Sequence, residues 1–380
     1  MKIVYIIHGT YNTAGMERTL SIKANYFADV LGYEVFIITT DQRNRPAYYI
    51  LSKKIRCVDL DVNFDQYYNK PLLISIFSFL IKQFICKVRL TRKLHELKAD
   101  IVISMMGRII SFLPKINDGS KKIFEYHFNR YVREQMLENS TWFKKLVYRI
   151  RANSELKNVE KLDSFVVLTH EDASMWGNFR NIQVIPNAIS FFTKENAKLD
   201  NKIVISVGRF EHQKGYDMLL SIWKPVVKKY PDWKLIVYGD GSKRDSIMAQ
   251  VNKEGLNESL IIKDPVSNIE SALLDASIYL MTSRYEGFPM VLVEAMACGL
   301  PVVSFRCPCG PADIIRHNED GFLIENGDVE KMSEYLSLLI KNEVLRKKAG
   351  ELARVNITRF TQDVVMSKWE ALFKDLIAKK

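Results

Sequence analysis

The sequence predicts an α/β protein made of two doubly wound domains in series, each a parallel sheet with helices on its faces. Short apolar runs alternate with amphipathic segments along most of the 380 residues. The alternation restarts after a polar stretch near residue 190, and this length is typical of two domains. We therefore expect domains at 1–188 and 189–360, with a ligand cleft between them at the carboxyl ends of both sheets.

The individual elements follow from these apolar runs. The first domain begins with the strand KIVYIIHG, a helix ending at Gly32 and the strand YEVFIITT. Further strands are predicted at IRCVDLD, ADIVISMM, KKIFEYH and SFVVLTH. In the second domain, strands are predicted at KIVISVGR, WKLIVYGDG, LIIKD, IYLMTS and PVVSF. The tail, residues 361–380, is predicted to be one amphipathic helix.

Positive charge is concentrated in the first half of the chain. Residues 1–190 hold 28 Lys and Arg against 18 Asp and Glu, a net charge of +10, and the remainder carries +1. This asymmetry points to a polyanion or an anionic membrane surface as a partner. No motif typical of nucleic-acid binding accompanies it, so we expect no nucleic acid. The five cysteines form no disulfide framework or zinc pattern, which favours a reducing cytosol.

Two basic segments of the first half could contact a membrane surface. Segment 71–97 has apolar residues at helical spacing, with Lys and Arg gathered toward its end. It fits a membrane-surface helix and a helix that covers the sheet equally well. The stretch WFKKLVYRIR, residues 142–151, favours the membrane. No segment approaches the roughly 20 apolar residues that cross a bilayer, so we expect peripheral attachment at most.

The segment RYEGFPMVLVEAMACGLPVVSF is the most informative motif. It places Glu286 and Glu294 on either side of a chain break and a helix start, because Pro289 suits a first helical turn. Free amides at such a helix start can bind a phosphate. The residues that lead into the helix and could supply these contacts are Gly287, Phe288, Pro289 and Met290. Helix-dipole stabilisation of one acid and solvation of the other explain the same pattern without a ligand.

Further candidates lie where strands of the second domain end. In VGRFEHQKG, Arg209 and Lys214 are suited to gripping a diphosphate, although two solvated bases on a loop are an equal alternative. The turn YGDGS contains Gly239 and Gly241, which could approach a ligand or could only permit the bend.

Two candidates belong to the first domain. Gly15, in a strand–loop–helix entry, could bring backbone amides close to a phosphate, and His127 stands at a strand end. The entry lacks the full G-x-G-x-x-G pattern, which argues against a dinucleotide-binding oxidoreductase. Asp59 and Asp61 could suggest a metal, but with no third ligand in view they are interpreted as solvated acids.

Together and in this order, these motifs resemble retaining glycosyltransferases of family 4, which have the GT-B fold and build bacterial polysaccharides and polyprenyl-diphosphate-linked glycans. The resemblance covers nearly the whole chain and is most specific in EGFPMVLVEAMACGLPVV. It implies a hexosyltransferase that takes a hexose or N-acetylhexosamine from a nucleoside-diphosphate sugar, with UDP as the expected nucleotide. The acceptor would be a lipid-linked glycan, and the enzyme would work without metal or other cofactor at the inner face of the cell membrane.

The resemblance also implies a role for each candidate residue. Arg209 and Lys214 would hold the donor diphosphate. Glu294 would bind the ribose, Glu286 the donor sugar, and His127 would lie near the sugar's 6-position.

Other implications concern the ends of the chain. The amides of 287–290 would help to seat the donor sugar, and Gly15 would let the first loop approach the phosphates. Ala14 departs from the family, where many members have a second glycine. The last helix would cross back to the first domain.

Two alternatives stay open at the level of the sequence. A GT-B sugar-nucleotide epimerase would turn over the donor without an acceptor. A catalytically silent, membrane-associated partner subunit would have no need of the charged residues that the motifs retain.

Overall fold

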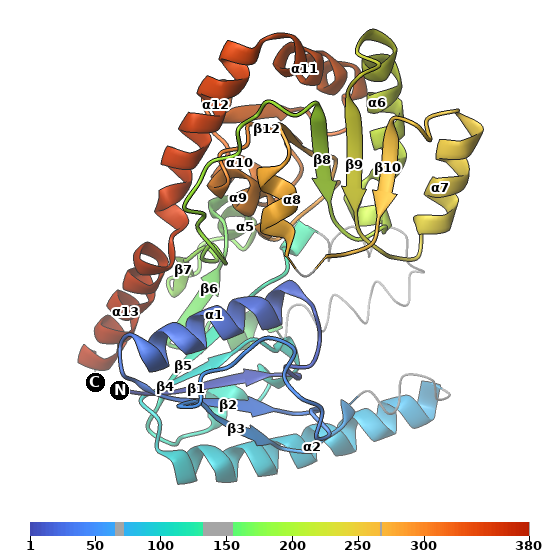
Figure 1. Cartoon of the computed structure of the whole chain (residues 1–380). Coiled ribbons are helices and arrows are strands. Elements are labelled where there is room, and N and C mark those ends of the chain that lie inside the picture. The colour runs from blue at the N-terminus through green and yellow to red at the C-terminus, as the bar shows by residue number, and fades with distance from the viewer. Residues whose placement is uncertain (65–71, 132–154, 267, 380) are drawn as a thin grey trace. The chain divides into compact units, whose positions relative to one another are not determined.

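The computed structural model describes residues 1–64, 72–131, 155–266 and 268–379, and its chain folds into two compact units (Figure 1). Unit 1 comprises Met1–Leu168, Ala173–Ala188 and Val365–Lys380. Unit 2 comprises Thr169–Asp172 and Ile189–Val364. Each unit contains one parallel sheet covered by helices, which confirms the predicted α/β class of two doubly wound units.

The sheet of unit 1 has seven strands in the order β3-β2-β1-β4-β5-β6-β7, and all neighbouring strands are parallel. The strands are β1 (Lys2–Ile7), β2 (Glu34–Thr39), β3 (Arg56–Asp59), β4 (Ile101–Ser104), β5 (Lys121–Glu125), β6 (Ser164–Val167) and β7 (Ile182–Val184). Strand order reverses beside β1, so the carboxyl ends of β1 and β4 form a topological switch point, where ligands of such sheets bind.

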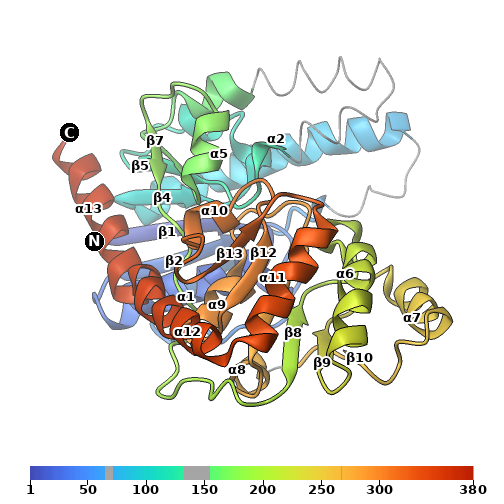
Figure 2. The ribbon, with the colours of Figure 1, turned by 90° about the horizontal axis from the view of Figure 1, so that it is seen from above.

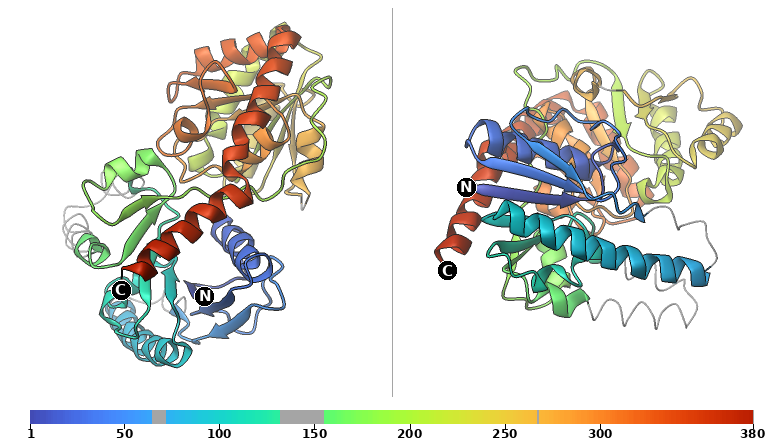
Figure 3. Two further views of the ribbon diagram at one scale, coloured as in Figure 1. Left: turned by 90° about the vertical axis from the view of Figure 1, so that its left-hand side faces the viewer. Right: turned by 90° about the horizontal axis from the view of Figure 1, so that it is seen from below.

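The two faces of this sheet follow the alternation of side chains along each strand. Ile3, Tyr5 and Ile7 of β1 pack with α1 (Gly15–Asp29) and α13 (Gln362–Ala378). Val4 and Ile6 point to the opposite face, which α2 (Leu72–Leu97) covers (Figure 3). Both faces are therefore apolar, as a parallel sheet requires.

The last helix, α13, belongs to unit 1 although it follows unit 2 in the sequence. Trp369 and Phe373 are buried in the core of unit 1, and the Phe373 ring lies 5.5 Å from that of Phe27 on α1. This confirms the prediction that the chain returns to its first domain.

Helix α2 packs on the sheet through apolar side chains and is also hydrogen-bonded to the loop after β3. Its buried residues belong to the core under the sheet: Cys86, Leu90, Leu94 and Leu97. Lys82 and Arg89 do not project freely at the rim. The Lys82 ammonium donates to the carbonyls of Val62 (2.8 Å) and Asn63, and Arg89 donates to those of Leu60 and Asp61 (2.6 and 2.8 Å). Much of α2 therefore covers the sheet and clamps the loop that follows β3.

Unit 2 has a six-stranded parallel sheet in the order β10-β9-β8-β11-β12-β13. The strands are β8 (Ile203–Val207), β9 (Lys234–Tyr238), β10 (Leu260–Lys263), β11 (Ile278–Met281), β12 (Val302–Phe305) and β13 (Gly321–Ile324). One face packs against α6 (Tyr216–Lys229), α7 (Arg244–Lys253) and α11 (Val329–Lys341), as Figure 2 shows. The helix α9 (Met290–Ala297) contacts β11, β12 and α12 (Glu343–Asn356).

The remaining helical segments are short. They are α5 (His170–Met175), α8 (Ile269–Leu274), α10 (Pro311–Ile314) and the 3₁₀ turns Gly107–Ile109, Leu113–Lys115, His212–Lys214 and Ile357–Phe360.

Candidate active site

The paired-glutamate motif lies at the carboxyl edge of β11 in unit 2, where the chain leaves the strand and enters α9. Pro289 is the residue before the first helical turn, and no side chain caps that turn. The helix ends at Ala297, and Gly299 follows with a positive φ of 80°. The predicted break and helix start are therefore present, with Glu286 before them and Glu294 inside the helix.

Glu286 forms an ion pair with Lys214, which the sequence places 72 residues away. The Lys214 Nζ lies 2.6 Å from Glu286 Oε1, and the two side chains are 20% and 7% exposed. Glu286 is therefore not a solvated acid. Two of the predicted site residues meet at one point of the sheet edge.

The backbone around Lys214 fixes this meeting. Gly215 has a φ of 66°, and a Cβ there would stand 2.1 Å from the carbonyl oxygen of Thr282 at the end of β11. The Thr282 hydroxyl donates to the Lys214 carbonyl at 2.9 Å. Glycine is therefore required for the turn to lie against β11, and this contact places the lysine beside Glu286.

Arg284 holds the two loops together, and sequence reasoning did not select it. Its guanidinium binds both carboxylate oxygens of Asp217 (2.9 and 2.6 Å) and the carbonyl of His212 (2.9 Å). The Gln213 amide donates to the Tyr285 carbonyl at 3.1 Å. Arg284 is the first residue of the quoted motif, but only the fold reveals that its partner is at the start of α6.

Glu294 is fully buried, and its Oε1 accepts a hydrogen bond of 2.5 Å from the Ser190 hydroxyl. Ser190 comes from the segment that enters unit 2, over one hundred residues earlier. The Ser190 hydroxyl thus orients the carboxylate that the family resemblance assigns to the ribose. Ser190 was not predicted from the sequence.

The glycines of the YGDGS turn serve the packing of the sheet edge. A Cβ on Gly239 would stand 1.9 Å from the Gly208 carbonyl oxygen, and one on Gly241 would stand 2.8 Å from that of Phe210. Both glycines therefore allow the loops after β8 and β9 to touch, which is the bend-permitting alternative. Arg209 lies in the loop after β8, and its side chain is exposed.

Gly15 and His127 belong to unit 1. Gly15 is the first residue of α1, and a Cβ there would meet no atom within 4 Å, so packing does not require glycine at this position. His127 follows β5 with a side chain only 6% exposed, and its Nε2 lies 3.1 Å from Glu125 Oε1. The imidazole therefore lies beside a buried carboxylate.

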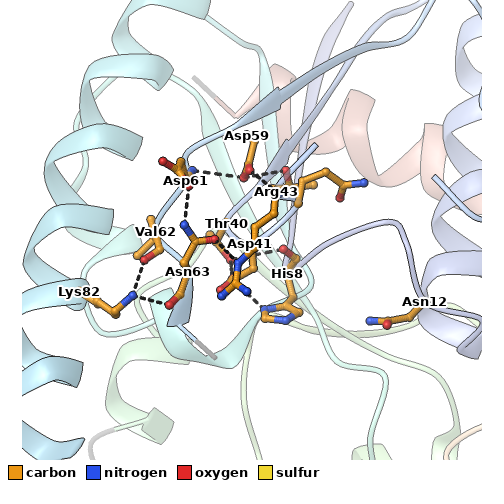
Figure 4. A network of polar contacts seen from close by, with 12 residues as sticks. His8, Asn12, Thr40, Asp41, Arg43, Asp59, Asp61, Val62, Asn63 and Lys82 are labelled. Atoms are coloured by element: carbon orange, nitrogen blue, oxygen red, sulfur yellow. Dashed lines mark hydrogen bonds and ion pairs between the residues drawn. The ribbon is translucent and has the colours of Figure 1, made fainter. Parts of the chain in front are cut away.

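A second histidine–carboxylate pair occupies the carboxyl edge of β1 and β2 (Figure 4). His8 Nδ1 lies 2.9 Å from Asp41 Oδ2, and the Thr40 hydroxyl donates to the same oxygen. Burial alone would raise the pKa of Asp41, but the His8 and Thr40 contacts hold it below its ordinary value. Neither His8 nor Asp41 was predicted, because both fall in ordinary strand-end positions.

The acids Asp59 and Asp61 are exposed, as expected, and they also shape the loop after β3. Asp59 accepts from the Thr39 hydroxyl and the Arg43 amide at 3.1 Å each. Within the described residues, no group of three or more His, Cys, Asp or Glu side chains is arranged to hold a metal ion.

A comparison with protein families identifies unit 2. The family model "Glycosyl transferases group 1" matches residues 188–356, nearly the whole of this unit. Residues 188–356 are a group 1 glycosyltransferase domain. The Lys214–Glu286 pair and α9 lie within this domain.

Similar sequences extend the match to the whole chain. This chain is 28% identical over 377 residues to an uncharacterized glycosyltransferase of Haemophilus influenzae, covering 98% of this chain and 99% of the relative. It is 25% identical to the Campylobacter jejuni GalNAc-alpha-(1->4)-GalNAc-alpha-(1->3)-diNAcBac-PP-undecaprenol alpha-1,4-N-acetyl-D-galactosaminyltransferase, over 99% of both chains. The poly(ribitol-phosphate) alpha-N-acetylglucosaminyltransferase of Staphylococcus aureus is 29% identical over 69% of this chain and 53% of its own length.

Solved structures share the fold. The S. aureus protein TarM superposes with a TM-score of 0.78 at 20% identity, over 98% of both chains. The lipopolysaccharide outer core galactosyltransferase WaaB gives 0.75 at 21% identity, over 99% of both. The chain has the GT-B fold, as the resemblance implies.

One expectation about membranes can be compared with the described residues, and another cannot. None of the helices in these parts of the chain has the combination of length and apolar composition that spanning a bilayer demands. The basic stretch 142–151 lies outside the described residues.

Proposed function

We propose that this glycosyltransferase transfers a hexose or N-acetylhexosamine, with retention, from a UDP-sugar to a lipid-linked glycan in the synthesis of a bacterial surface polysaccharide. The observation that carries the proposal is the Lys214–Glu286 pair beside the start of α9. One cation, one carboxylate and a helix start without a side-chain cap meet at one sheet edge. This combination suits a substrate that joins a sugar to a diphosphate.

The pair suggests how donor binding and departure of the nucleotide are coupled. In the absence of ligand, Glu286 holds Lys214 in place and balances its charge. A diphosphate beside Lys214 would take over this charge, and Glu286 would then be available to a hydroxyl of the donor sugar. As the glycosidic bond breaks, negative charge grows on the diphosphate, and Lys214 and Arg209 would stabilise it. Glu294, oriented by Ser190, would bind the ribose.

The choice of donor and acceptor rests on the relatives. The Staphylococcus relative transfers N-acetylglucosamine by its name, and the Campylobacter relative carries an undecaprenol-diphosphate glycan in its name. A structure of TarM and one of the pneumococcal O-GlcNAc transferase GtfA contain UDP. Retention and independence from metals enter the proposal from the family resemblance, and product anomers by NMR and transfer in excess EDTA test them.

A donor panel tests the reaction itself. Release of nucleoside diphosphate from UDP- and GDP-sugars is measured with and without a bacterial lipid extract, and we expect release that depends on the extract. Lys214→Met and Glu286→Gln should each lower kcat/KM at least about 100-fold, since both act where charge develops. Lys202→Met is the matched control, because Lys202 pairs with Asp232 on the exposed, opposite end of β8.

The outcomes separate the alternatives. Donor conversion without extract and without diphosphate release would indicate an epimerase. No donor consumed under any condition, with unchanged nucleotide binding in Glu286→Gln, would reject the transferase in favour of a silent partner subunit.

Membrane attachment is a second part of the proposal, and the first half of α2 supports it. Large apolar side chains are exposed along one side of this helix: Ile74, Phe77, Leu80, Ile81, Phe84 and Val88. Lys87 and Arg92 follow on exposed positions, so an apolar surface continues into a cationic one. This arrangement suits an anionic bilayer surface.

Vesicle flotation tests the attachment. The chain should float with vesicles that contain about one-third anionic lipid, and Phe77→Ser with Phe84→Ser should abolish this. A control pair, Tyr48→Ser with Ile50→Ser, removes exposed apolar side chains elsewhere in unit 1 and should leave flotation unchanged. Equal flotation of both double variants would contradict a role for α2.

A further inference from the structure

The segment Cys307-Pro308-Cys309 forms the loop that leaves β12 in unit 2. Both cysteine side chains are fully buried. Burial raises the pKa of each thiol above its ordinary value, so both sulfurs stay protonated and are poor nucleophiles. The segment therefore contributes to the unit through its backbone and its packing rather than through sulfur chemistry.

This loop contacts the candidate active site at two points. The Glu286 amide donates to the Pro308 carbonyl at 3.0 Å. Gly310 has a φ of 115°, and a Cβ there would stand 2.5 Å from Cδ of Pro289, the residue before α9. The loop after β12 therefore supports both the carboxylate residue that pairs with Lys214 and the start of the helix.

The loop contains one strained residue. Cys309 has a φ of 62°, in the left-handed region that residues other than glycine rarely adopt. A conformation of this kind persists only where the surroundings hold it, and such positions cluster at functional sites. Here a carboxylate contributes to the hold, because Glu171 Oε2 accepts from the Cys309 amide at 2.8 Å.

Glu171 is itself anchored by the helix that follows the loop. It belongs to Thr169–Asp172, the short piece of chain that precedes the rest of unit 2. The Asp313 carboxylate on α10 accepts from the amides of His170 and Glu171 at 2.8 and 3.4 Å. The short piece and the loop region are thus joined reciprocally, because each provides a carboxylate that binds backbone amides of the other.

We propose that Glu171 is a positioning residue of the transferase site. Its carboxylate holds the Cys309 amide, and the loop fixed in this way keeps the Pro308 carbonyl against the Glu286 amide. The Glu286 side chain is thereby aimed at the donor sugar. This last step rests on the proposed function, whereas the coupling between the two loops is a property of the chain without substrate.

Amide hydrogen exchange of the full chain, measured by NMR, tests the coupling without substrate. Glu171→Ala removes the acceptor of the Cys309 amide, so the amides of Cys309 and Glu286 should both exchange at least about tenfold faster. Glu171→Gln keeps an acceptor oxygen and should restore slow exchange at both positions. Faster exchange at Cys309 with unchanged exchange at Glu286 overturns the positioning role.

A milder variant and a matched control separate positioning from folding. Glu171→Asp keeps the charge but withdraws it by one methylene, so it should change exchange in the same direction if Glu171→Ala does not fold. The control is Asn342→Ala, because Asn342 also accepts a backbone amide, that of Leu345 at the start of α12 (2.9 Å). It should leave exchange at Cys309 and Glu286 unchanged. Faster exchange of these amides in the control as well would indicate general loosening and reject a specific role for Glu171.

Kinetics give the second readout, with the donor that the panel identifies. Glu171→Ala should lower kcat/KM about tenfold through misplacement of Glu286, and Glu171→Gln should recover most of it. The Kd for UDP alone should not change, because only the carboxylate that binds the sugar is displaced. Unchanged kcat/KM in Glu171→Ala, or an equal loss of UDP affinity, overturns the positioning of Glu286 and leaves the transferase intact. Coupled exchange in a chain that consumes no donor supports the coupling of the loops and rejects the proposed function.

Discussion

The carboxyl edges of the two sheets are built by different means. In unit 2, loops approach one another through glycine, as Gly215 does at Thr282 and Gly239 at Gly208. In unit 1, the corresponding edge is held by side chains that reach across strands, such as the His8–Asp41 pair. Close backbone contact through glycine is added to the side-chain pairs of the first edge, whereas the second edge relies more on side-chain pairing.

This difference has a consequence for the sequence of each edge. A glycine forced by backbone contact tolerates little replacement, which constrains the sequence around it. These glycines lie within residues 188–356, which the family model matches. Side-chain networks can be rebuilt in many ways, so the edge of unit 1 is less constrained in sequence.

The largest expected effect is that of Gly239→Ala. Its Cβ would overlap the Gly208 carbonyl oxygen, so unit 2 should lose at least about 3 kcal/mol in its free energy of unfolding. Gly15→Ala is the matched variant in unit 1, where no atom lies within 4 Å, and it should change stability by less than about 0.5 kcal/mol. Urea unfolding of both measures the contrast.

The activity of Gly15→Ala tests the role that the family resemblance gives to Gly15. If Gly15 exists to admit a phosphate, Gly15→Ala should fold normally and still turn over the donor more slowly. Normal stability together with normal kinetics would contradict the role that the family resemblance gives to Gly15.

The second effect concerns acid stability, and Glu125 controls it. Its pKa in the folded protein is about 2, lower than the ordinary 4.5, so its contribution to stability is complete above pH 4.5 and is lost as the pH falls toward 2. The chain should therefore lose on the order of 3 kcal/mol over this range from this group. Lys23→Met with Glu125→Gln should flatten the slope of unfolding free energy against pH between 4.5 and 2, measured by circular dichroism. An unchanged slope would show that Glu125 is not ionised by its neighbours.

The fold was predictable from the sequence to a large extent, and the site only in part. Alternating apolar runs identify strands because burial on both faces leaves little freedom in composition. The segment 286–294 was predictable because Pro289 and the flanking acids are local. The partners of those acids, Lys214 and Ser190, are 72 and 104 residues distant, and only the packed sheet brings them together.

The buried pairs of unit 1 show the same limit more strongly. Lys23 lies on a helix that is amphipathic by its apolar residues, and a lysine there is usually solvated. Nothing local indicates that its ammonium enters the core to meet Glu125, 102 positions later. Long-range ion pairs of this kind leave no periodicity for a sequence pattern to reveal.

The third effect is a loss of about 2 kcal/mol in the free energy of unfolding, expected for Lys214→Met in unit 2. The substitution leaves the Glu286 carboxylate, which is 7% exposed, without the charge that faces it. Glu286→Gln in the same chain should recover more than half of the loss. The double-mutant cycle is measured by thermal unfolding, and additive effects would show that the ion pair contributes nothing to the edge.

The smallest effect tests whether a side chain helps the backbone hydrogen bonds to hold the loop after β3 in unit 1. This loop contains Asp61 and Asn63 at positive φ, and Lys82 bonds two of its carbonyl oxygens. Lys82→Met should therefore lower the free energy of unfolding by about 1 kcal/mol and should speed amide hydrogen exchange in residues 60–63. Lys87→Met, on the exposed side of the same helix, is the control and should change neither. If Lys82→Met leaves exchange in the loop unchanged, its backbone hydrogen bonds to Thr39 and Thr40 hold it without the lysine, and the contrast between the two sheets disappears at β3.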